Sequence, residues 1–404
     1  MCIMKMDKKL LRVRFARTTK DRENKFEVWY MNERVIAEIN MSNLKHNLSE
    51  VRKCIKPTSK VMGIVKSNAY GHGIVEISKY LEDFGVDYFG VAIVDEAIKL
   101  RKNGITRPIL IMGYFEQNKV VDIVHNDIMQ TIFRYEDAIL ISEEAKNQDV
   151  SAKIQIKIDT GMNRIGFKIK SDLVDELKRI YELPNIIVEG FYTHLYAADK
   201  KDKKSVRLQI EKFENVIAEL MKAGISVTNK HVLNSAGVID LGREYSMDLV
   251  RTGIMLYGLY GSDEVDKNNA DLKPVMCLKT KVIFVKEVGI DENISYGEGY
   301  ITKRNTMIAT IPVGYADGYS RKLTNVGRVL IKGEYANVTG KICMNQFMVD
   351  VTHIKNVNIG DEVVLFGEQQ GNKIGIGEIA RMCNTIDYEI LTGINDRVIK
   401  KYLF

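Results

Sequence analysis

The chain has few of the features that mark secreted, membrane or disordered proteins. Its 404 residues include only five prolines, and no apolar run is long enough to cross a membrane. Residues 1–24 contain no apolar segment of the kind found in secretory signals. These absences predict a globular cytoplasmic protein with no membrane partner.

The cysteines speak against a disulfide framework and against a metal site. They are five in number, which is odd, and no CxxC pair occurs. None lies near a histidine at the spacing of metal ligands, so we expect reduced thiols and no bound metal. The positions are Cys2, Cys54, Cys277, Cys343 and Cys383.

Positive charge gathers at the start of the chain. The net charge is +6, and residues 1–34 hold ten Lys or Arg against five Asp or Glu, so about +5 of the excess lies there. A nucleic-acid-binding domain more often spreads basic residues over a folded face. We therefore interpret residues 1–35 as a solvated, disordered basic extension, and we expect no nucleic-acid partner.

Residues 36–272 alternate short apolar runs with helical patterns. The helical stretches, such as 94–103 and 206–223, place apolar residues at i, i+3 and i+4. Eight strands that are each followed by a helix or a long connection favour a (β/α)8 barrel of the TIM type, with a doubly wound sheet as the alternative. The expected strands are 60–66, 88–92, 109–113, 129–132, 154–159, 186–193, 231–234 and 247–251.

The pattern changes after about residue 272. Helical periodicity largely ends, and runs rich in Val, Ile and Thr alternate with turn signals. This predicts that residues 273–404 form a separate, mostly antiparallel β domain with a short helix at 376–382. The expected strands are 279–285, 307–313, 328–332, 346–351 and 362–366.

A lysine at the end of the first expected barrel strand is the main candidate for chemistry. The segment VMGIVKSNAYGHG (61–73) runs from five mostly apolar residues into Lys66 and then into polar residues and glycines. Barrel enzymes place their reacting groups at the carboxyl ends of the strands. Partial burial there lowers the pKa of an amine, which favours attack on a carbonyl carbon. Taken alone, the pattern also fits a surface lysine whose stem lies along apolar residues.

The whole segment resembles the pyridoxal-phosphate lysine signature of the alanine racemase family. The resemblance runs from about residue 36 to the end of the chain, because eight further blocks follow in the family's order. They are IKIDTGMNRIG (156–166), FYTHLYAAD (191–199), LNSAG (233–237), VRTGIMLYGLY (250–260), ISYGEGY (294–300), IPVGYADGY (311–319), GKICMNQFMVDVT (340–352) and TIDYEIL (385–391).

The resemblance implies two acid–base residues on opposite faces of the substrate. Lys66 would bind pyridoxal 5′-phosphate and act on one face, and Tyr296 would act on the other. Racemisation removes the Cα proton from one side and returns a proton to the other, so opposed groups suit it. A tyrosine pKa is ordinarily about 10, so a nearby cation must help this phenol to ionise. Arg164 matches the family's arginine near this phenol and the substrate carboxylate. Taken alone, Tyr296 also fits a half-buried strand tyrosine.

Other matching positions would hold the cofactor and the substrate. Arg251 matches the arginine that faces the pyridine nitrogen, where a cation disfavours protonation and weakens the ring as an electron sink. Met344 would present its backbone N–H to the substrate carboxylate, and Tyr315 would line the entrance. The remaining cofactor-binding residues that the resemblance implies are Tyr70, His194, Ser235, Gly253, Ile254 and Tyr388.

The resemblance also implies a modified lysine and a dimer. Lys157 matches a lysine that many family members carry as a carbamate, which would orient Arg164, whereas unmodified Lys157 would repel it. In the family, the residues at the positions of Tyr296 and Met344 come from the partner subunit. The expected assembly is therefore a head-to-tail homodimer with shared active sites.

Three departures from the family pattern leave the substrate open. Asn345 stands where Asp is usual, Lys341 where Arg is usual, and Tyr196 replaces a smaller residue. Serine or a broader set of amino acids is therefore an alternative to alanine, although Tyr388 favours alanine. More remote alternatives are a fold-related decarboxylase, whose cysteine and phosphate motifs we do not find, and a single-barrel cofactor carrier without a second domain. If alanine is the substrate and the source is bacterial, the product would be a peptidoglycan precursor.

Overall fold

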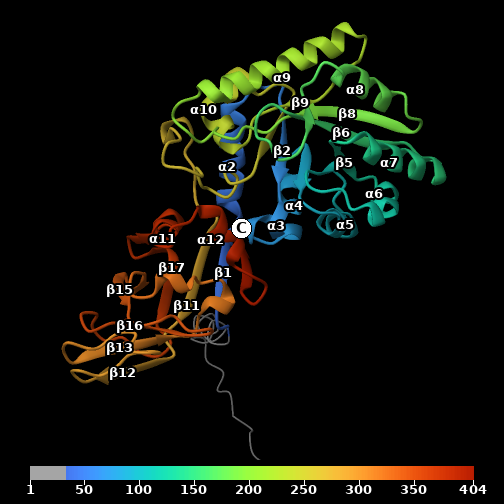
Figure 1. Ribbon diagram of the computed structural model, residues 1–404. Helices are drawn as coiled ribbons and strands as arrows, with labels where there is room; N and C mark the ends of the chain where they lie inside the picture. Colours follow the sequence, from blue (N-terminus) through green and yellow to red (C-terminus); the bar gives the residue numbers. More distant parts are fainter. Residues whose placement is uncertain (1–32) are drawn as a thin grey trace, which may run out of the picture.

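A ring of parallel strands forms the first unit of the structure (Figure 1). The computed structural model describes residues 33–404, so most of the expected N-terminal extension, residues 1–32, lies outside the described residues. Within residues 33–404, eight strands follow one another around the ring in the order β10-β2-β3-β4-β5-β6-β8-β9. Their bounds are β2 (Lys60–Ile64), β3 (Tyr88–Val91), β4 (Ile109–Ile111), β5 (Met129–Ile132), β6 (Ala152–Asp159), β8 (Ile186–Tyr192), β9 (Lys230–His231) and β10 (Leu249–Thr252).

Two backbone hydrogen bonds join the ends of this sheet and nearly close the ring. The N–H of Asp248 donates to the carbonyl of Lys230, and the N–H of Arg251 donates to the carbonyl of Leu233, both at 3.1 Å. A doubly wound sheet would instead keep two open edges. The (β/α)8 prediction is therefore confirmed. Each expected barrel strand is present, with the same bounds for 129–132 and a shift at one or both ends of the others.

Two of the barrel strands, β3 and β4, form where the sequence is continuously apolar. Every residue of β3, β4 and β5 is buried. Strands of a parallel barrel are covered on both faces, by the barrel interior and by the outer helices, so they need no polar face. A two-residue strand, β7 (Phe167–Lys168), follows the segment that carries Arg164 and pairs in parallel with the end of β6.

Helices cover the outside of the barrel. The longest, α9 at the top of Figure 1, buries residues at 206, 210, 213, 217 and 220, which is the spacing of one helical face. The expected helices 94–103 and 206–223 correspond to α5 and α9. The bounds are α2 (Met41–Cys54), α3 (Lys66–Tyr70), α4 (Ile74–Asp83), α5 (Val94–Lys102), η1 (Gln117–Lys119), α6 (Val120–His125), α7 (Tyr135–Asn147), α8 (Leu173–Tyr181), α9 (Lys204–Lys222), α10 (Ser235–Tyr245) and η2 (Lys267–Asn269).

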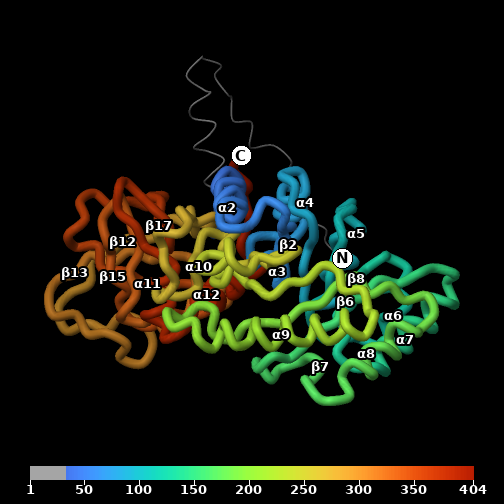
Figure 2. The backbone as a smooth tube through the Cα atoms, turned by 90° about the horizontal axis from the view of Figure 1, so that it is seen from above, coloured from blue at the N-terminus to red at the C-terminus, as the bar shows by residue number. Residues whose placement is uncertain are grey.

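A second sheet lies beside the barrel (Figure 2) and confirms the expected antiparallel β domain. Its order is β12-β13-β16-β15-β14-β17-β11-β1-β19, with β18 paired to β17. The bounds are β1 (Ile36–Asn40), β11 (Met276–Lys281), β12 (Phe284–Val288), β13 (Thr306–Ile311), β14 (Arg328–Ile331), β15 (Glu334–Val338), β16 (Phe347–Asp350), β17 (Glu362–Gln369), β18 (Asn372–Ile374) and β19 (Ile399–Leu403). Short helices accompany it, namely η3 (Tyr315–Asp317), η4 (Arg321–Leu323), α11 (Ile376–Met382) and α12 (Asp387–Gly393).

The sheet contains four strands that we did not expect, β1, β15, β18 and β19, and one expected strand is divided. The run 279–285 is divided between β11 and β12, because the backbone changes neighbours there: the N–H of Val282 donates to Asp361, and that of Ile283 donates to Thr310. β1 begins at Ile36, where we expected the barrel to begin, yet it pairs antiparallel with β11 and parallel with β19 in the second sheet. The second sheet therefore contains strands from both ends of the described chain.

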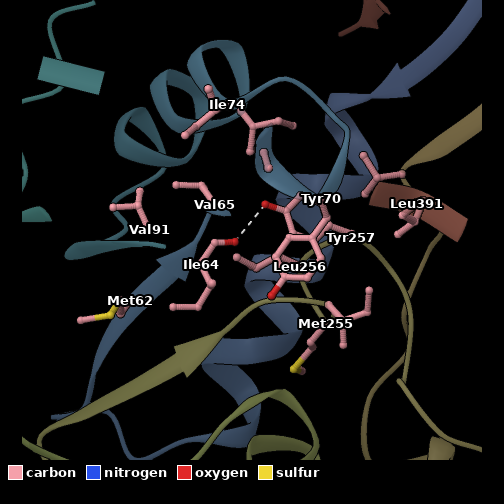
Figure 3. Close-up of a cluster of buried hydrophobic side chains, with 14 of the residues drawn as sticks. Met62, Ile64, Val65, Tyr70, Ile74, Val91, Met255, Leu256, Tyr257 and Leu391 are labelled. Atoms are coloured by element: carbon pink, nitrogen blue, oxygen red, sulfur yellow. Dashed lines mark hydrogen bonds between the residues drawn. The ribbon is translucent and has the colours of Figure 1, made fainter. Parts of the chain in front are cut away.

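One apolar core continues from the barrel into the second domain (Figure 3). The rings of Tyr70 and Tyr257 lie 4.9 Å apart between centroids, and the Tyr257 hydroxyl donates a 3.0 Å hydrogen bond to the carbonyl of Ile64. Leu391, from α12, packs in the same cluster. This packing brings α12, with Tyr388, to the mouth of the barrel. Within residues 33–404, no helix combines the length and apolar character that a membrane span requires.

Candidate active site

A cavity of about 560 Å³ lies at the carboxyl ends of the barrel strands. Ligand sites of (β/α)8 barrels occur at this end, where the loops after the strands converge. Ten of the thirteen residues that the sequence singles out line it. They are Lys66, Tyr70, Lys157, Arg164, His194, Ser235, Arg251, Gly253, Ile254 and Tyr388.

An unusual backbone turn presents Lys66 to this cavity. Residues 67–70 all have φ between +52° and +54°, so four consecutive non-glycine residues form a left-handed turn directly after the lysine. Such a conformation costs roughly 1–2 kcal/mol per residue because Cβ crowds the following carbonyl. Hydrogen bonds within the turn offset part of this cost, from the N–H of Ala69 to the carbonyl of Val65 (2.8 Å) and from Gly71 to Ser67 (3.0 Å).

Four Lys and Arg side chains line the cavity, and burial and the proximity of their charges lower the pKa of the two lysines. They are Lys66, Lys157, Arg164 and Arg251. Although Lys66 reaches solvent through the mouth, surrounding protein atoms and the charge of Arg164 lower the pKa of its amine. Burial, Arg164 and Arg251 lower the pKa of Lys157 to about 7. Both amines therefore lose their proton at a lower pH than an ordinary lysine does. The basic side chains that stay charged favour anionic ligands.

Arg251 is the most completely held of these cations. One terminal nitrogen donates to Nδ1 of His231 at 2.8 Å, and the other donates to the carbonyls of Thr193 and Val232 at 2.7 and 2.9 Å. Its Nε is buried and has no hydrogen-bond partner within the described residues. A guanidinium fixed in this way leaves one donor available for an acceptor atom of a ligand, such as an unprotonated pyridine nitrogen.

Hydroxyl and backbone groups form a cradle at the start of α10. Ser235 opens this helix, and its Oγ accepts from the N–H of Gly253 at 2.9 Å. A Cβ at position 253 would lie 2.4 Å from the Tyr70 hydroxyl, and one at Gly261 would lie 3.0 Å from the Tyr388 hydroxyl. Both phenols thus reach the cradle because glycine is present. N–H groups, hydroxyls and a helix N-terminus together suit a phosphate group.

The two phenols and His194 are uncharged near neutral pH. Burial raises the pKa of Tyr70, and burial and Asp199 raise the pKa of Tyr388 to about 12. Burial and the charge of Arg251 lower the pKa of His194 well below its usual range. Neutral hydroxyls can donate hydrogen bonds to a phosphate, and a neutral imidazole can pack against an aromatic ring without desolvating a charge.

The other three predicted residues lie together elsewhere, on the sheet domain. Tyr296 and Met344 line a separate hollow of about 460 Å³ and are 72% and 53% exposed. The N–H of Tyr315 donates to the carbonyl of Cys343, next to Met344, at 3.2 Å. None of the three lines the cavity that holds Lys66. A single chain therefore carries two separate parts of the predicted site.

The residues that hold Arg251 in place on the side of the barrel interior were not predicted from the sequence. His231 is fully buried, and its Nε2 lies 2.8 Å from Oε1 of Gln155, while Tyr192 stacks on the imidazole with centroids 4.8 Å apart. Burial and Arg251 lower the pKa of His231, so the ring is neutral and can accept from the guanidinium. The one signal available is that each lies in or beside a barrel strand that ends at the site.

The fold and the cavity define a (β/α)8 barrel protein with a cradle of hydroxyl and N–H groups, a lysine of lowered pKa and a second, antiparallel domain. Comparison with known proteins narrows this class. The family described as "Alanine racemase, N-terminal domain" matches residues 39–261, and "Alanine racemase, C-terminal domain" matches residues 275–402. The chain belongs to the alanine racemase family.

Relatives of known name resemble the chain over most of its length. "Alanine racemase 2" of Caldanaerobacter subterraneus subsp. tengcongensis is 43% identical over 91% of this chain and 94% of its own. "Alanine racemase" of Methanococcus maripaludis is 45% identical over 91% of this chain and 98% of its own. The solved alanine racemase of Clostridium difficile 630 is 41% identical and superimposes with a TM-score of 0.88, covering 92% of this chain and 96% of that one.

Proposed function

We propose that the protein is a pyridoxal 5′-phosphate-dependent alanine racemase. The observation that carries the proposal is the single cavity that combines the Lys66 amine, the unpartnered Nε of Arg251 and the cradle around Gly253. Pyridoxal phosphate, when bound, would supply a carbonyl carbon for Lys66 and an electron sink for the bonds at Cα of an amino acid. The names and the 41–45% identity of the relatives cited above support alanine as the substrate.

Named residues would hold each part of the cofactor. The phosphate would accept hydrogen bonds from the hydroxyls of Tyr70, Ser235 and Tyr388 and from backbone N–H groups of Gly253 and Ile254. Nε of Arg251 would donate to the ring nitrogen, and the neutral imidazole of His194 would pack beside the ring. A ring nitrogen that accepts from a buried guanidinium stays unprotonated, which limits how far charge spreads into the ring. This would favour return of the proton over side reactions.

We further propose that each active site is completed by a second copy of the chain. Tyr296, Met344 and Tyr315 would come from the partner's sheet domain, so that the Tyr296 phenol would face Lys66 across the substrate. The support is that Tyr296 and Met344 are exposed in a hollow remote from the Lys66 cavity, although their motifs match the family's active-site blocks. Arg164, in the same cavity as Lys66, would bind the substrate carboxylate and lower the cost of ionising that phenol.

A hybrid-dimer experiment tests the shared site. Lys66→Ala and Tyr296→Phe chains, each inactive as a homodimer, are unfolded, mixed and refolded together. If sites are shared, a hybrid dimer contains one site with both Lys66 and Tyr296 intact, so activity returns on mixing. If each chain builds its own site, every site in the mixture lacks one group, and the absence of recovered activity contradicts the proposal.

A further inference from the structure

One carboxylate joins the turn that carries Lys66 to the neighbouring barrel element. Glu96 lies in the first turn of α5, and its Oε2 accepts a 2.9 Å hydrogen bond from the N–H of Ala92, at the end of β3. Its Oε1 accepts from the N–H of Asn68 at 3.3 Å. Asn68 is the second residue of the left-handed turn. Glu96 therefore bridges two segments that border the cavity.

Ala92 follows the last residue of β3, and Asn68 lies inside the left-handed turn, so both N–H groups need an acceptor outside a regular helix or strand. A carboxylate is a stronger acceptor than a neutral side chain. The N–H groups of Ala69 and Gly71 donate to carbonyls within or next to the turn. The N–H group of Asn68 donates to Glu96 instead. Loss of this contact would leave the N–H of Asn68, in the middle of the strained turn, without its acceptor.

The charge of Glu96 also acts on the cavity. Among the described residues, no Lys, Arg or His forms an ion pair with it, and its negative charge raises the pKa of Lys66 while burial and Arg164 lower it. The other titratable and charged groups near Lys66 are Lys157 and His194, whose pKa values the Lys66 charge lowers, and Asp199, which lines the same cavity. Among the described residues, Glu96 is the negative charge that acts on the pKa of Lys66.

Two further contacts support the turn: Nδ2 of Asn68 donates to Oδ1 of Asp396 at 3.3 Å, and His72 contacts the far end. Nδ1 of His72 lies 3.0 Å from the carbonyls of both Ala69 and Tyr70, and burial lowers the pKa of this histidine to about 4. The neutral ring therefore donates from Nδ1, and it packs at a tilt against Tyr257, with centroids 4.5 Å apart. His72 holds the far end of the turn but brings no charge to Lys66.

We propose that Glu96 is a positioning residue for Lys66: its carboxylate holds the left-handed turn in place and supplies the negative charge that opposes Arg164. This inference rests on the proposed function, since it assigns Glu96 to the lysine that would bind the cofactor. The bridge to Ala92 and Asn68 carries the geometric part, and the lack of a cation partner carries the electrostatic part.

Two substitutions separate charge from reach. Glu96→Gln keeps the length of the side chain and removes the charge, whereas Glu96→Asp keeps the charge and shortens the reach. Asp95→Asn is the matched control, because Asp95 is the neighbouring acidic residue of α5 but is exposed and pairs with Lys119 at 2.7 Å. Thermal melting of each variant first establishes that it folds.

The readout is the pH at which Lys66 becomes reactive, measured in protein freed of cofactor. Competitive acetylation, quantified by peptide mass spectrometry, follows the uncharged amine. We expect Glu96→Gln to lower the midpoint by about 0.5–1 pH unit, and Glu96→Asp and Asp95→Asn to leave it near the wild-type value. A midpoint in Glu96→Gln equal to that of the wild type would overturn the electrostatic half of the proposal.

Rebinding of pyridoxal phosphate tests the geometric half. We expect both Glu96 variants to bind it several-fold more weakly than Asp95→Asn, with kcat reduced and KM for alanine little changed. Unchanged affinity in Glu96→Asp would overturn the positioning role. If instead wild-type protein fails to racemise any amino acid, the proposed function fails, and the acetylation midpoint still reports on Glu96 and Lys66.

Discussion

Gly253 lies directly against the phenolic end of Tyr70: a Cβ at position 253 would come within 2.4 Å of the Tyr70 hydroxyl oxygen and 3.1 Å of its Cζ. The hydroxyl cannot stay where it is if that atom is added, because real Cβ contacts are not this short. Tyr70 in turn packs on Tyr257 in the core (Figure 3), so its ring has little room to retreat. The glycine is therefore needed for space at the cradle.

We expect Gly253→Ala to weaken binding of pyridoxal phosphate by about tenfold or more, because the methyl group displaces the Tyr70 hydroxyl, which would donate to the phosphate. Titration of cofactor-free protein, followed by absorbance, gives the dissociation constant. Gly375→Ala is the control, since a Cβ there meets nothing within 4 Å. An affinity of Gly253→Ala equal to that of the control would show that the phosphate binds elsewhere.

Lys157 should bind carbon dioxide in a pH-dependent manner. Only the uncharged amine reacts, and its pKa of about 7 means that this form predominates above neutrality and disappears below about pH 6. A carbamate would replace a charge that repels Arg164 with one that attracts it. We expect labelled bicarbonate to give a carbamate NMR signal at about pH 8 that fades by about pH 6 and is absent in Lys157→Met. No signal at the higher pH would count against the modification.

The same lowered pKa has a consequence for stability. Between about 7 and the ordinary value of 10.5, the unfolded chain binds more protons at Lys157 than the folded chain does, so the free energy of unfolding rises with pH through this window. Below about 7 both states hold the proton and the full penalty of burying the charge remains. Urea unfolding of cofactor-free protein should show a smaller rise for Lys157→Met than for the wild type, and an identical rise would refute this assignment.

Arg251 should be a major contributor to stability as well as a cofactor contact. Arg251→Met leaves the carbonyls of Thr193 and Val232 and Nδ1 of His231 buried without a donor. We expect the free energy of unfolding to fall by at least about 3 kcal/mol. Arg304→Met, which removes an exposed arginine, should change it by about 0.5 kcal/mol or less. Equal, small effects in urea titrations would mean that the buried network relaxes around the loss.

Tyr196 is the residue through which substrate size should be tested. It lines the cavity, is 52% exposed, and lies beside Gly161, in the segment that carries Arg164. We expect Tyr196→Ser to raise kcat/KM for serine and larger amino acids, relative to alanine, by about tenfold, which is the scale of one steric contact in a pocket. A ratio that stays constant across several amino acids would remove Tyr196 from the account of specificity.

Much of the barrel could be predicted because several of its strands are apolar runs that alternate with helical patterns. Buried strands such as β3 and β4 are apolar throughout, so their pattern differs from that of helices with one polar face. The sheet domain was harder to predict: β15, with the sequence EYANV, mixes polar and apolar residues because part of it faces solvent. The pairing of β1 with β11 and β19 joins residues more than two hundred positions apart, which no local pattern reveals.

The candidate site shows the same division between local and distant information. Motifs predict Lys66, Arg164 and Arg251, and the structure places all three in one cavity, although their roles stay predictions. Glu96 and His72 act on the site through a left-handed turn of four non-glycine residues, a conformation that propensities disfavour. Their contacts could therefore not be read from the sequence.

The most direct test of the central claim is racemisation started from both enantiomers. Purified protein with pyridoxal phosphate is supplied with L-alanine or, separately, with D-alanine, and chiral chromatography follows both enantiomers over time. The account predicts that each reaction converges on an equal mixture, that alanine is converted faster than serine, and that Tyr296→Phe retains cofactor but loses most turnover. Failure to form the opposite enantiomer from either starting material, or undiminished turnover in Tyr296→Phe, would contradict it.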